Sequence, residues 1–229
     1  TNIMTTGKEY DNIYPVWDWT RIPGTTAIGN QDKTSLEGYQ IGNNEFGGGV
    51  SDGVNGIIAY KGKYNELQAN KAYFFFDNMM FCIGSDISYV QNDNVLTSVE
   101  QNLLNGEVIY NDGQEKQLSS NSNMQLKQLK WVYHNNTGYI FRGTDNVTIQ
   151  NMSQAGSWKD INATGESGLI DKNVFSVWIN HGLNPENASY QYIVVPDKSI
   201  NAFRDLAEQI DFYIAQNDGS VQAIREGNK

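Results

Sequence analysis

The sequence predicts an all-β protein built as a large antiparallel β-sandwich with one short helix near its C-terminus. Three features of the 229 residues lead to this prediction. Apolar runs of strand length recur along the chain, turn-forming Asn, Asp and Gly clusters separate them, and a single segment shows helical periodicity. Strands that follow one another without long intervening helices form antiparallel sheets, and two such sheets bury their apolar faces against each other.

The clearest strand pair is a hairpin at 71–76 and 79–83, joined by the turn residues Asp77-Asn78. Both arms are apolar on both faces, which is typical of strands that are covered from two sides. Residues 27–49 are polar and rich in Gly and Asn, and are expected to be loop with one short edge strand. Further strands are expected at 56–61, 86–91, 95–101, 106–110, 124–134, 138–142, 146–151, 174–181 and 189–195.

The helix is expected at Ser199 to Gln209. Ser199 can cap its N-terminus, and Phe203, Leu206 and Ile210 form an apolar stripe, while Asp205 and Glu208 face water. A last hairpin, 211–216 and 220–224, turns at Asn217-Asp218-Gly219. Because no linker and no internal repeat divides the sequence, residues 1–229 are expected to form a single domain.

The composition narrows the classes of function. The net charge of −10 argues against binding to nucleic acid. The sequence contains no run of 18 apolar residues, which a membrane-spanning helix would need. Cys82 is the only cysteine, so an intrachain disulfide and a cysteine-based metal site are excluded, and it lies in an apolar run as a core residue would. No cofactor or metal is predicted.

The segment from Tyr14 to Thr26 holds two of the five tryptophans and two of the four prolines. Two prolines eight residues apart exclude a regular helix or a central strand, so a rigid irregular segment is expected, with Asp18 and Arg21 as a local ion pair. Residue type alone fits a plug at the edge of the β-core as well as a wall that faces sugar. The other tryptophans, Trp131, Trp158 and Trp178, are expected in the core.

This segment, Tyr-Pro-Val-Trp-Asp-Trp followed by Ile-Pro-Gly-Thr-Thr, resembles a signature of polysaccharide lyase family 8, the hyaluronate, chondroitin AC and xanthan lyases. The resemblance runs in register from about Tyr14 to Val195, and its details lean toward the chondroitin AC type. It continues in Gly47-Gly48-Gly49-Val50-Ser51-Asp52-Gly53, Lys71-Ala72-Tyr73-Phe74-Phe75-Phe76-Asp77 and Val177-Trp178-Ile179-Asn180-His181-Gly182.

The resemblance implies the central super-sandwich domain of an enzyme that cleaves uronic-acid polysaccharides by β-elimination. In the family the catalytic Asn, His, Tyr and Arg belong to an N-terminal helical toroid, which this sequence lacks, as it lacks the C-terminal β domain. We therefore assign no catalytic residue here and expect the chain alone to be inactive. The implied partners are that helical domain and an acidic polysaccharide such as chondroitin or hyaluronan. The implied location is secreted or periplasmic, in a bacterium.

In chondroitin AC lyases a Glu and an Asn of the loop before the Gly-Gly-Val-Ser-Asp-Gly motif approach the substrate. Here the loop is 40–46: Asn43 or Asn44 matches the Asn, and the Glu falls nearest Gln40, with Glu37 and Glu45 beside it. Amides suit sugar hydroxyls because they both donate and accept hydrogen bonds. The alternative is that these are only turn-forming residues. The aromatic residues expected to meet sugar faces are Trp17, Trp19, Tyr39 and Phe46.

Two other functions stay open at this point. One is a free-standing carbohydrate-binding β-sandwich without catalysis. The other is a mutarotase-like epimerase, which would use His and Glu, but His134 and His181 lie in expected strands and are interpreted as polar groups near a core. Asp52 is interpreted as a turn residue that accepts hydrogen bonds from its own backbone.

Overall fold

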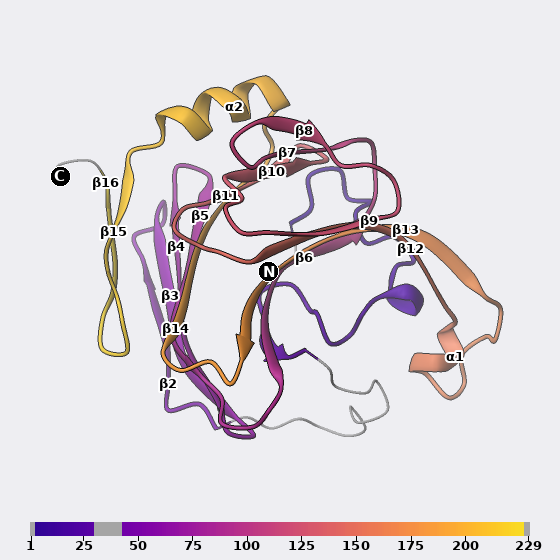
Figure 1. The fold of residues 1–229 in the computed structure, drawn as a ribbon, viewed down its shortest axis with the longest axis horizontal. Helices are drawn as coiled ribbons and strands as arrows, with labels where there is room; N and C mark the ends of the chain where they lie inside the picture. Colours follow the sequence, from indigo (N-terminus) through magenta and orange to yellow (C-terminus); the bar gives the residue numbers. More distant parts are fainter. Residues whose placement is uncertain (1–2, 30–42, 227–229) are drawn as a thin grey trace.

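The computed structural model, which describes residues 3–29 and 43–226, consists of two large antiparallel sheets packed face to face (Figure 1). The first sheet has five strands in the order β1-β6-β13-β12-β9. All-β, sandwich-like architecture is thus confirmed. The five strands are β1 (Thr26–Ile28), β6 (Asn94–Leu103), β13 (Ile170–Leu183), β12 (Val147–Gly156) and β9 (Ser122–Leu126).

The second sheet has nine strands in the order β2-β3-β4-β5-β14-β11-β10-β7-β8. Its strongest sequence signal, the hairpin between β4 and β5, turns at Asp77 and Asn78, whose φ angles of 47° and 59° match a tight hairpin turn. The strands are β2 (Phe46–Ser51), β3 (Gly56–Tyr64), β4 (Leu67–Phe76), β5 (Met79–Ser88), β14 (Ala188–Val195), β11 (Thr137–Phe141), β10 (Trp131–His134), β7 (Val108–Asn111) and β8 (Glu115–Gln117).

The main core fills the space between the two sheets. Apolar side chains from β6, β12 and β13 on one side meet those from β5, β11 and β14 on the other, and they include the buried thiol of Cys82. Burial raises the pKa of that thiol to about 12, so Cys82 is the core residue that was expected. The two layers are thus held together mainly by burial of apolar surface.

A third layer covers the outer face of the nine-stranded sheet. It is made of α2 (Ile200–Gln209), at the top of Figure 1, and the separate hairpin of β15 (Phe212–Asn217) and β16 (Gln222–Glu226), at its left side. Ser199 caps α2 by accepting a hydrogen bond from the backbone N–H of Ala202, as predicted. Phe203, fully buried, packs between the rings of Trp131 and Tyr133.

Two strand boundaries differ from the prediction. Residues 124–134 form two strands, β9 and β10, which belong to different sheets, because the polar segment 127–130 carries the chain from one layer to the other. Two separate strands were expected at 79–83 and 86–91. The structure has a single strand there, β5, which runs from Met79 to Ser88. Asp86 adopts a φ of 52° and forms a bulge there, so the strand bends without ending.

Other elements were not predicted. Strand β8 and the short helix α1 (Trp158–Ile161) were missed, and the 3-10 helix η1 (Tyr14–Val16) lies in the tryptophan segment. Trp131 and Trp178 are buried as expected, but Trp158 begins α1 and is only half-buried. Of segment 27–49, the described part contains most of β1 and the start of β2, each at the edge of its sheet.

Within the described residues, no helix is long and apolar enough to cross a membrane.

Candidate functional site

The tryptophan segment packs on the outer face of the five-stranded sheet. Pro15 stands in the first turn of η1, where its missing N–H leaves no bond unmade. The indole of Trp17 is 4% exposed, and its Nε1 donates to the backbone oxygen of Gln101 on β6 at 3.1 Å. Because its ring is enclosed, Trp17 offers no face to a sugar, and the expectation that it contacts substrate is corrected: Trp17 anchors the segment.

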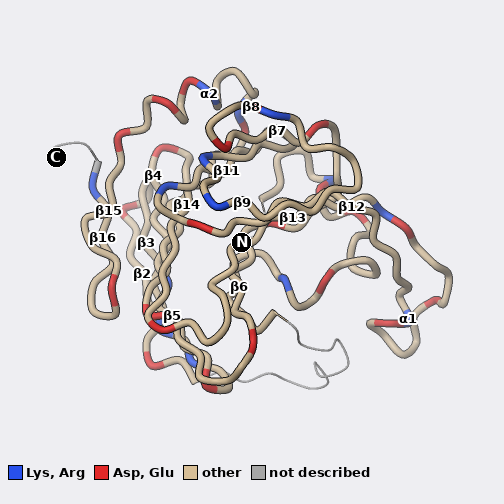
Figure 2. The backbone as a smooth tube through the Cα atoms, in the orientation of Figure 1, with Lys and Arg blue, Asp and Glu red and all other residues tan. Residues whose placement is uncertain are grey.

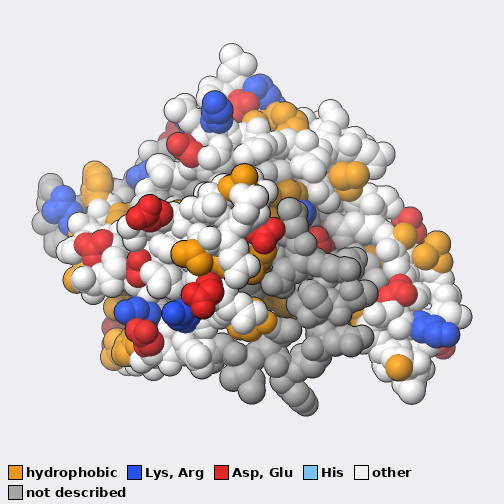
Figure 3. All heavy atoms as spheres, turned by 60° about the horizontal axis from the view of Figure 1, so that its bottom comes forward, with side chains coloured by type: hydrophobic (Ala, Val, Ile, Leu, Met, Phe, Trp, Pro, Cys, Tyr) orange, Lys and Arg blue, Asp and Glu red, His pale blue; other side chains and the backbone are white. Residues whose placement is uncertain are grey.

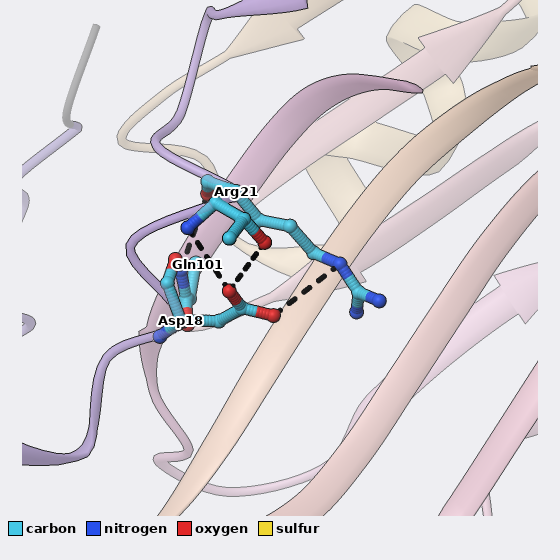
Figure 4. A network of polar contacts seen from close by, with 4 residues as sticks. Asp18, Arg21 and Gln101 are labelled. Atoms are coloured by element: carbon cyan, nitrogen blue, oxygen red, sulfur yellow. Dashed lines mark hydrogen bonds and ion pairs between the residues drawn. The ribbon is translucent and has the colours of Figure 1, made fainter. Parts of the chain in front are cut away.

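Asp18, Arg21 and Gln101 hold the segment to β6 through polar contacts (Figure 4). The Gln101 amide nitrogen donates to the backbone oxygens of Asp18 at 3.0 Å and Arg21 at 3.1 Å, and its side-chain oxygen accepts from the Asp18 N–H at 2.8 Å. The expected ion pair is present, with Arg21 Nε 3.5 Å from Asp18 Oδ2. The Arg21 guanidinium also lies 4.0 Å from the centre of the Trp178 ring.

Trp19 keeps part of its surface in solvent. Its ring meets the Trp17 ring edge-on at 5.3 Å, and its Nε1 donates to the backbone oxygen of Tyr14 at 3.2 Å. Tyr14 in turn contacts the ring of Trp158. Trp19 is therefore the tryptophan of the predicted pair that a ligand could reach.

The predicted substrate loop is described from Asn43 onward, while Gln40, Tyr39 and Glu37 lie outside the described residues. Asn43, Asn44 and Glu45 continue the edge of β2, because the N–H groups of Asn43 and Glu45 donate to the backbone oxygens of Lys63 and Lys61 on β3. The three side chains are exposed, as is Phe46. Glu45 forms an ion pair with Lys61 at 3.0 Å.

A pocket of about 140 Å³ opens between the two sheets beside Asn44. It joins the end of the tryptophan segment to the predicted loop, because Thr26 of β1 and Asn44 both line it. The structure does not bring Trp19 to this pocket: Trp19 belongs to the cluster on the outer face of the five-stranded sheet. The remaining lining residues come from β3 and β4: Tyr60, Gly62, Lys63, Tyr64, Leu67, Ala69 and Lys71.

Lys71 is the most unusual residue of this pocket, since it is 1% exposed. Its ammonium donates to the backbone oxygen of Gly24 at 2.7 Å, and the Tyr73 hydroxyl donates to the same oxygen at 3.2 Å. Burial lowers the pKa of Lys71 to about 7. Lys71 begins one of the four sequence motifs, but no role was predicted for it, although a lysine within an apolar strand was the signal.

The two histidines are polar groups near the core, His134 buried and His181 half-buried. His134 Nε2 accepts from the N–H of Asn105 at 3.0 Å, and His181 Nε2 lies 2.7 Å from Thr97 Oγ1. Burial lowers the pKa of each to about 4. In the part of the chain that the structure describes, no three His, Cys, Asp or Glu residues come together to hold a metal ion. Asp52 Oδ1 accepts from the N–H groups of Val54 and Asn55, which confirms its place in a turn.

The fold and the comparisons with known proteins define this chain as a super-sandwich domain of the polysaccharide lyase type. Residues 1–207 match the family described as polysaccharide lyase family 8, super-sandwich domain. The chain belongs to polysaccharide lyase family 8, as its four motifs predicted. The family resemblance and the predicted fold class are both confirmed, and a free-standing binding module is not favoured.

The similar proteins are lyases. Chondroitinase-AC from Pedobacter heparinus is 42% identical over 199 residues, which cover 86% of this chain and 28% of that protein. Xanthan lyase from Bacillus sp. (strain GL1) is 29% identical over 228 residues, covering 94% and 24% of the two chains. The chain therefore spans about a quarter of the length of these relatives.

Solved structures give the same result. A chondroitinase AC lyase studied in oligosaccharide complexes superposes with a TM-score of 0.82 at 34% identity, covering 95% of this chain and 32% of that one. A Paenibacillus xanthan lyase superposes with a TM-score of 0.87 at 26% identity, covering 98% and 23%.

Proposed function

We propose that this domain forms one wall of the substrate cleft in a lyase that cleaves uronic-acid polysaccharides, of the chondroitin or hyaluronan type, by β-elimination. The observation that carries the proposal is the exposed amide pair Asn43 and Asn44 at the edge of a family 8 super-sandwich domain. The similarity to Chondroitinase-AC supports the substrate class.

The chemistry requires a further domain. β-Elimination removes the proton beside a carboxylate, so a base must lie close while donors or cations neutralise the carboxylate charge. His134 is buried and His181 half-buried, each held in a hydrogen bond, and positive and negative residues are interspersed along the described backbone (Figure 2). We therefore place the catalytic residues on an N-terminal helical domain of the same protein, which would be the principal partner of this one.

The contacts of this wall would be polar with one aromatic contribution. Asn43 and Asn44 present amides to sugar hydroxyls, Gln40 belongs to the same loop, and Glu45 is held beside them by Lys61. Trp19 is the aromatic candidate. The protein would work outside the cytoplasm, secreted or periplasmic, since a polysaccharide of this kind is too large to enter a cell intact.

A domain exchange tests the proposal. Residues 1–207 replace the matching region of Chondroitinase-AC, and turnover of chondroitin is followed by the ultraviolet absorbance of the unsaturated product. The folded chimera should be active, and Asn43→Ala with Asn44→Ala should lower kcat/KM roughly 10- to 100-fold through lost hydrogen bonds to the substrate.

The matched control is Asn123→Ala, which removes another exposed amide, on β9 at the edge of the other sheet. Equal kcat/KM in the double variant and the control would show that the two asparagines do not contact the substrate. A chimera that folds, by circular dichroism and gel filtration, but never cleaves would contradict the assignment of the domain itself.

A further inference from the structure

The pocket between the sheets contains a cation that is not paired with any carboxylate of the residues that the structure describes. Lys71 lines the pocket, and no ion pair joins its ammonium to a carboxylate of the described residues. Its one acceptor there is the backbone oxygen of Gly24, so two of its three N–H groups have no acceptor among them. A buried ammonium normally has a charged partner, because its desolvation is costly.

The groups that face Lys71 make the pocket unfavourable for a second cation and open to an anion. Tyr73 on the same strand, Tyr190 on β14 and Cys82 on β5 are all neutral at pH 7, since burial raises the pKa of each. The Tyr190 ring lies 5.8 Å from the ammonium. His181 on β13 is also neutral, because burial next to Lys71 lowers its pKa. None of these groups brings a negative charge at neutral pH.

The rim adds donors of the right kind. Lys63 is exposed and carries a second positive charge, Asn44 offers an amide, and Tyr60 offers a hydroxyl. Together with Lys71 they supply donors from β3, β4 and the loop before β2, while the Thr26 hydroxyl is already bonded to Thr97 Oγ1 at 2.7 Å. Charge-assisted hydrogen bonds from ammonium and amide groups are the usual way in which proteins hold carboxylate and sulfate oxygens.

The size of the pocket limits what it takes. About 140 Å³ is small beside the 300 Å³ or more of pockets that enclose whole small molecules. Gly62 keeps the space open, because a Cβ there would lie 3.0 Å from the Tyr60 ring and 3.5 Å from the Asn44 side-chain oxygen. One charged group of a larger ligand fits, and a whole sugar ring does not.

We propose that this pocket, between Lys71, Lys63 and Asn44, binds a single oxyanion group, a carboxylate or a sulfate, carried by a saccharide. The saccharide origin rests on the proposed function, whereas the anion site itself does not. An anion bound here would favour the charged form of Lys71, and so raise the pKa of its ammonium.

The test follows the Lys71 side chain by NMR in the 229-residue chain with ¹³C-labelled lysine, its signal assigned by its loss in Lys71→Met. The protein is titrated with pH in sodium sulfate, in sodium glucuronate and in sodium chloride at equal ionic strength. We expect the pKa of Lys71 to rise by roughly one unit or more in sulfate or glucuronate relative to chloride. Lys116, exposed on β8 at the opposite edge of the same sheet, should not shift and serves as the internal control.

Two variants separate the pocket from general ion effects. Gly62→Ala adds a methyl group to the pocket without changing any charge, and Lys63→Met removes the exposed charge at the rim. Each substitution should weaken anion binding about tenfold. The loss is measured as a tenfold higher concentration of sulfate or glucuronate needed to produce half of the maximal shift in the Lys71 pKa. Lys116→Met should leave that concentration unchanged.

The anions also distinguish the sources. A shift with sulfate alone assigns the pocket to a sulfate ester, a shift with glucuronate alone assigns it to a uronate carboxylate, and a shift with both assigns it to either group. A Lys71 pKa that is equal in all three salts, or a shift that survives undiminished in Gly62→Ala, overturns the proposal. Because no step involves polysaccharide cleavage, this failure is distinct from failure of the domain exchange.

Discussion

Two tryptophans in the same short segment, Trp17 and Trp19, have different environments. From the sequence, both are expected among the aromatic residues that meet sugar faces, although residue type alone fits a plug at the edge of the β-core equally well. Only the fold separates them: Trp17 is turned onto β6 and bonded to Gln101, while Trp19 remains partly in solvent. A pattern of residue types does not report which side of an irregular segment meets the sheet.

Trp17→Ala should lower the free energy of unfolding by on the order of 3 kcal/mol. The substitution leaves a cavity the size of an indole on the sheet and removes the hydrogen bond to Gln101. Urea denaturation measures the loss, and Trp19→Ala is the control, with a smaller effect because its ring is partly exposed. A Trp17→Ala loss no larger than that of the control would show that the indole is not an anchor.

Lys71 should make the stability of the protein increase with pH above neutrality. Its pKa is about 7 in the folded chain against 10.5 for the free side chain, so between these values the unfolded state binds one proton more. The free energy of unfolding therefore rises with pH in this window, by at most about 1 kcal/mol per pH unit, and below pH 7 this contribution is at its minimum.

Lys71→Met should flatten that slope between pH 7.5 and 9 in urea titrations. The window lies above the folded and unfolded pKa values of His134 and His181 and the raised pKa of Glu100, about 7. Cys82, whose pKa is 9.0 in the unfolded chain and about 12 in the folded one, contributes equally to the slope of wild type and Lys71→Met. Lys116→Met, on the exposed side chain, should leave the slope as it is. An identical slope in wild type and Lys71→Met would mean that Lys71 is charged in the folded protein.

The elements were predictable where the pattern is local. The β4–β5 hairpin follows from two apolar runs and an Asp-Asn turn, and α2 follows from a Ser cap and a 3–4 stripe. The crossing between β9 and β10 was not predictable, because the sheet that each strand joins is decided by contacts far away in sequence. The role of Lys71 was hidden for the same reason: its acceptor, Gly24, stands 47 residues away.

Gly138→Ala should loosen the attachment of α2 to the nine-stranded sheet. A Cβ at Gly138 would lie 1.9 Å from the ring of Phe203, so either the ring or the helix must move. We expect a loss of about 1 to 3 kcal/mol in the free energy of unfolding. Gly168→Ala is the control, since nothing lies within 4 Å of a Cβ there. Equal stability of the two variants would contradict the close contact.

At the scale of the whole molecule, the net charge is −10. On the face shown in Figure 3, the basic side chains of the described residues are scattered among acidic ones and form no surface for polyanions. A protein of this charge repels a uronic-acid polymer over distances shorter than the screening length. The two positive groups at the pocket, Lys71 and Lys63, do not overcome this net repulsion.

Residues 1–229 alone should therefore show no lyase activity on chondroitin or hyaluronan and should bind both weakly. The purified chain is mixed with each polymer, and the absorbance of unsaturated uronate is compared with an untreated blank. Absorbance that rises in the wild-type chain, and is lost in an Asn43→Ala, Asn44→Ala double variant, would place catalysis within this domain and refute the expectation.

The hairpin of β15 and β16 shares no backbone ladder with either large sheet, so the outermost layer opens more easily than the rest. Its two strands bond to each other, and it touches the sheet through side chains such as Phe212 on Phe81 and through the Asn217 amide on Gly84. A gap of about 250 Å³ also separates part of it from the sheet. Amide hydrogen exchange should be fastest there among the strands, because this unit can detach in a partial unfolding step while the two inner sheets keep their protection.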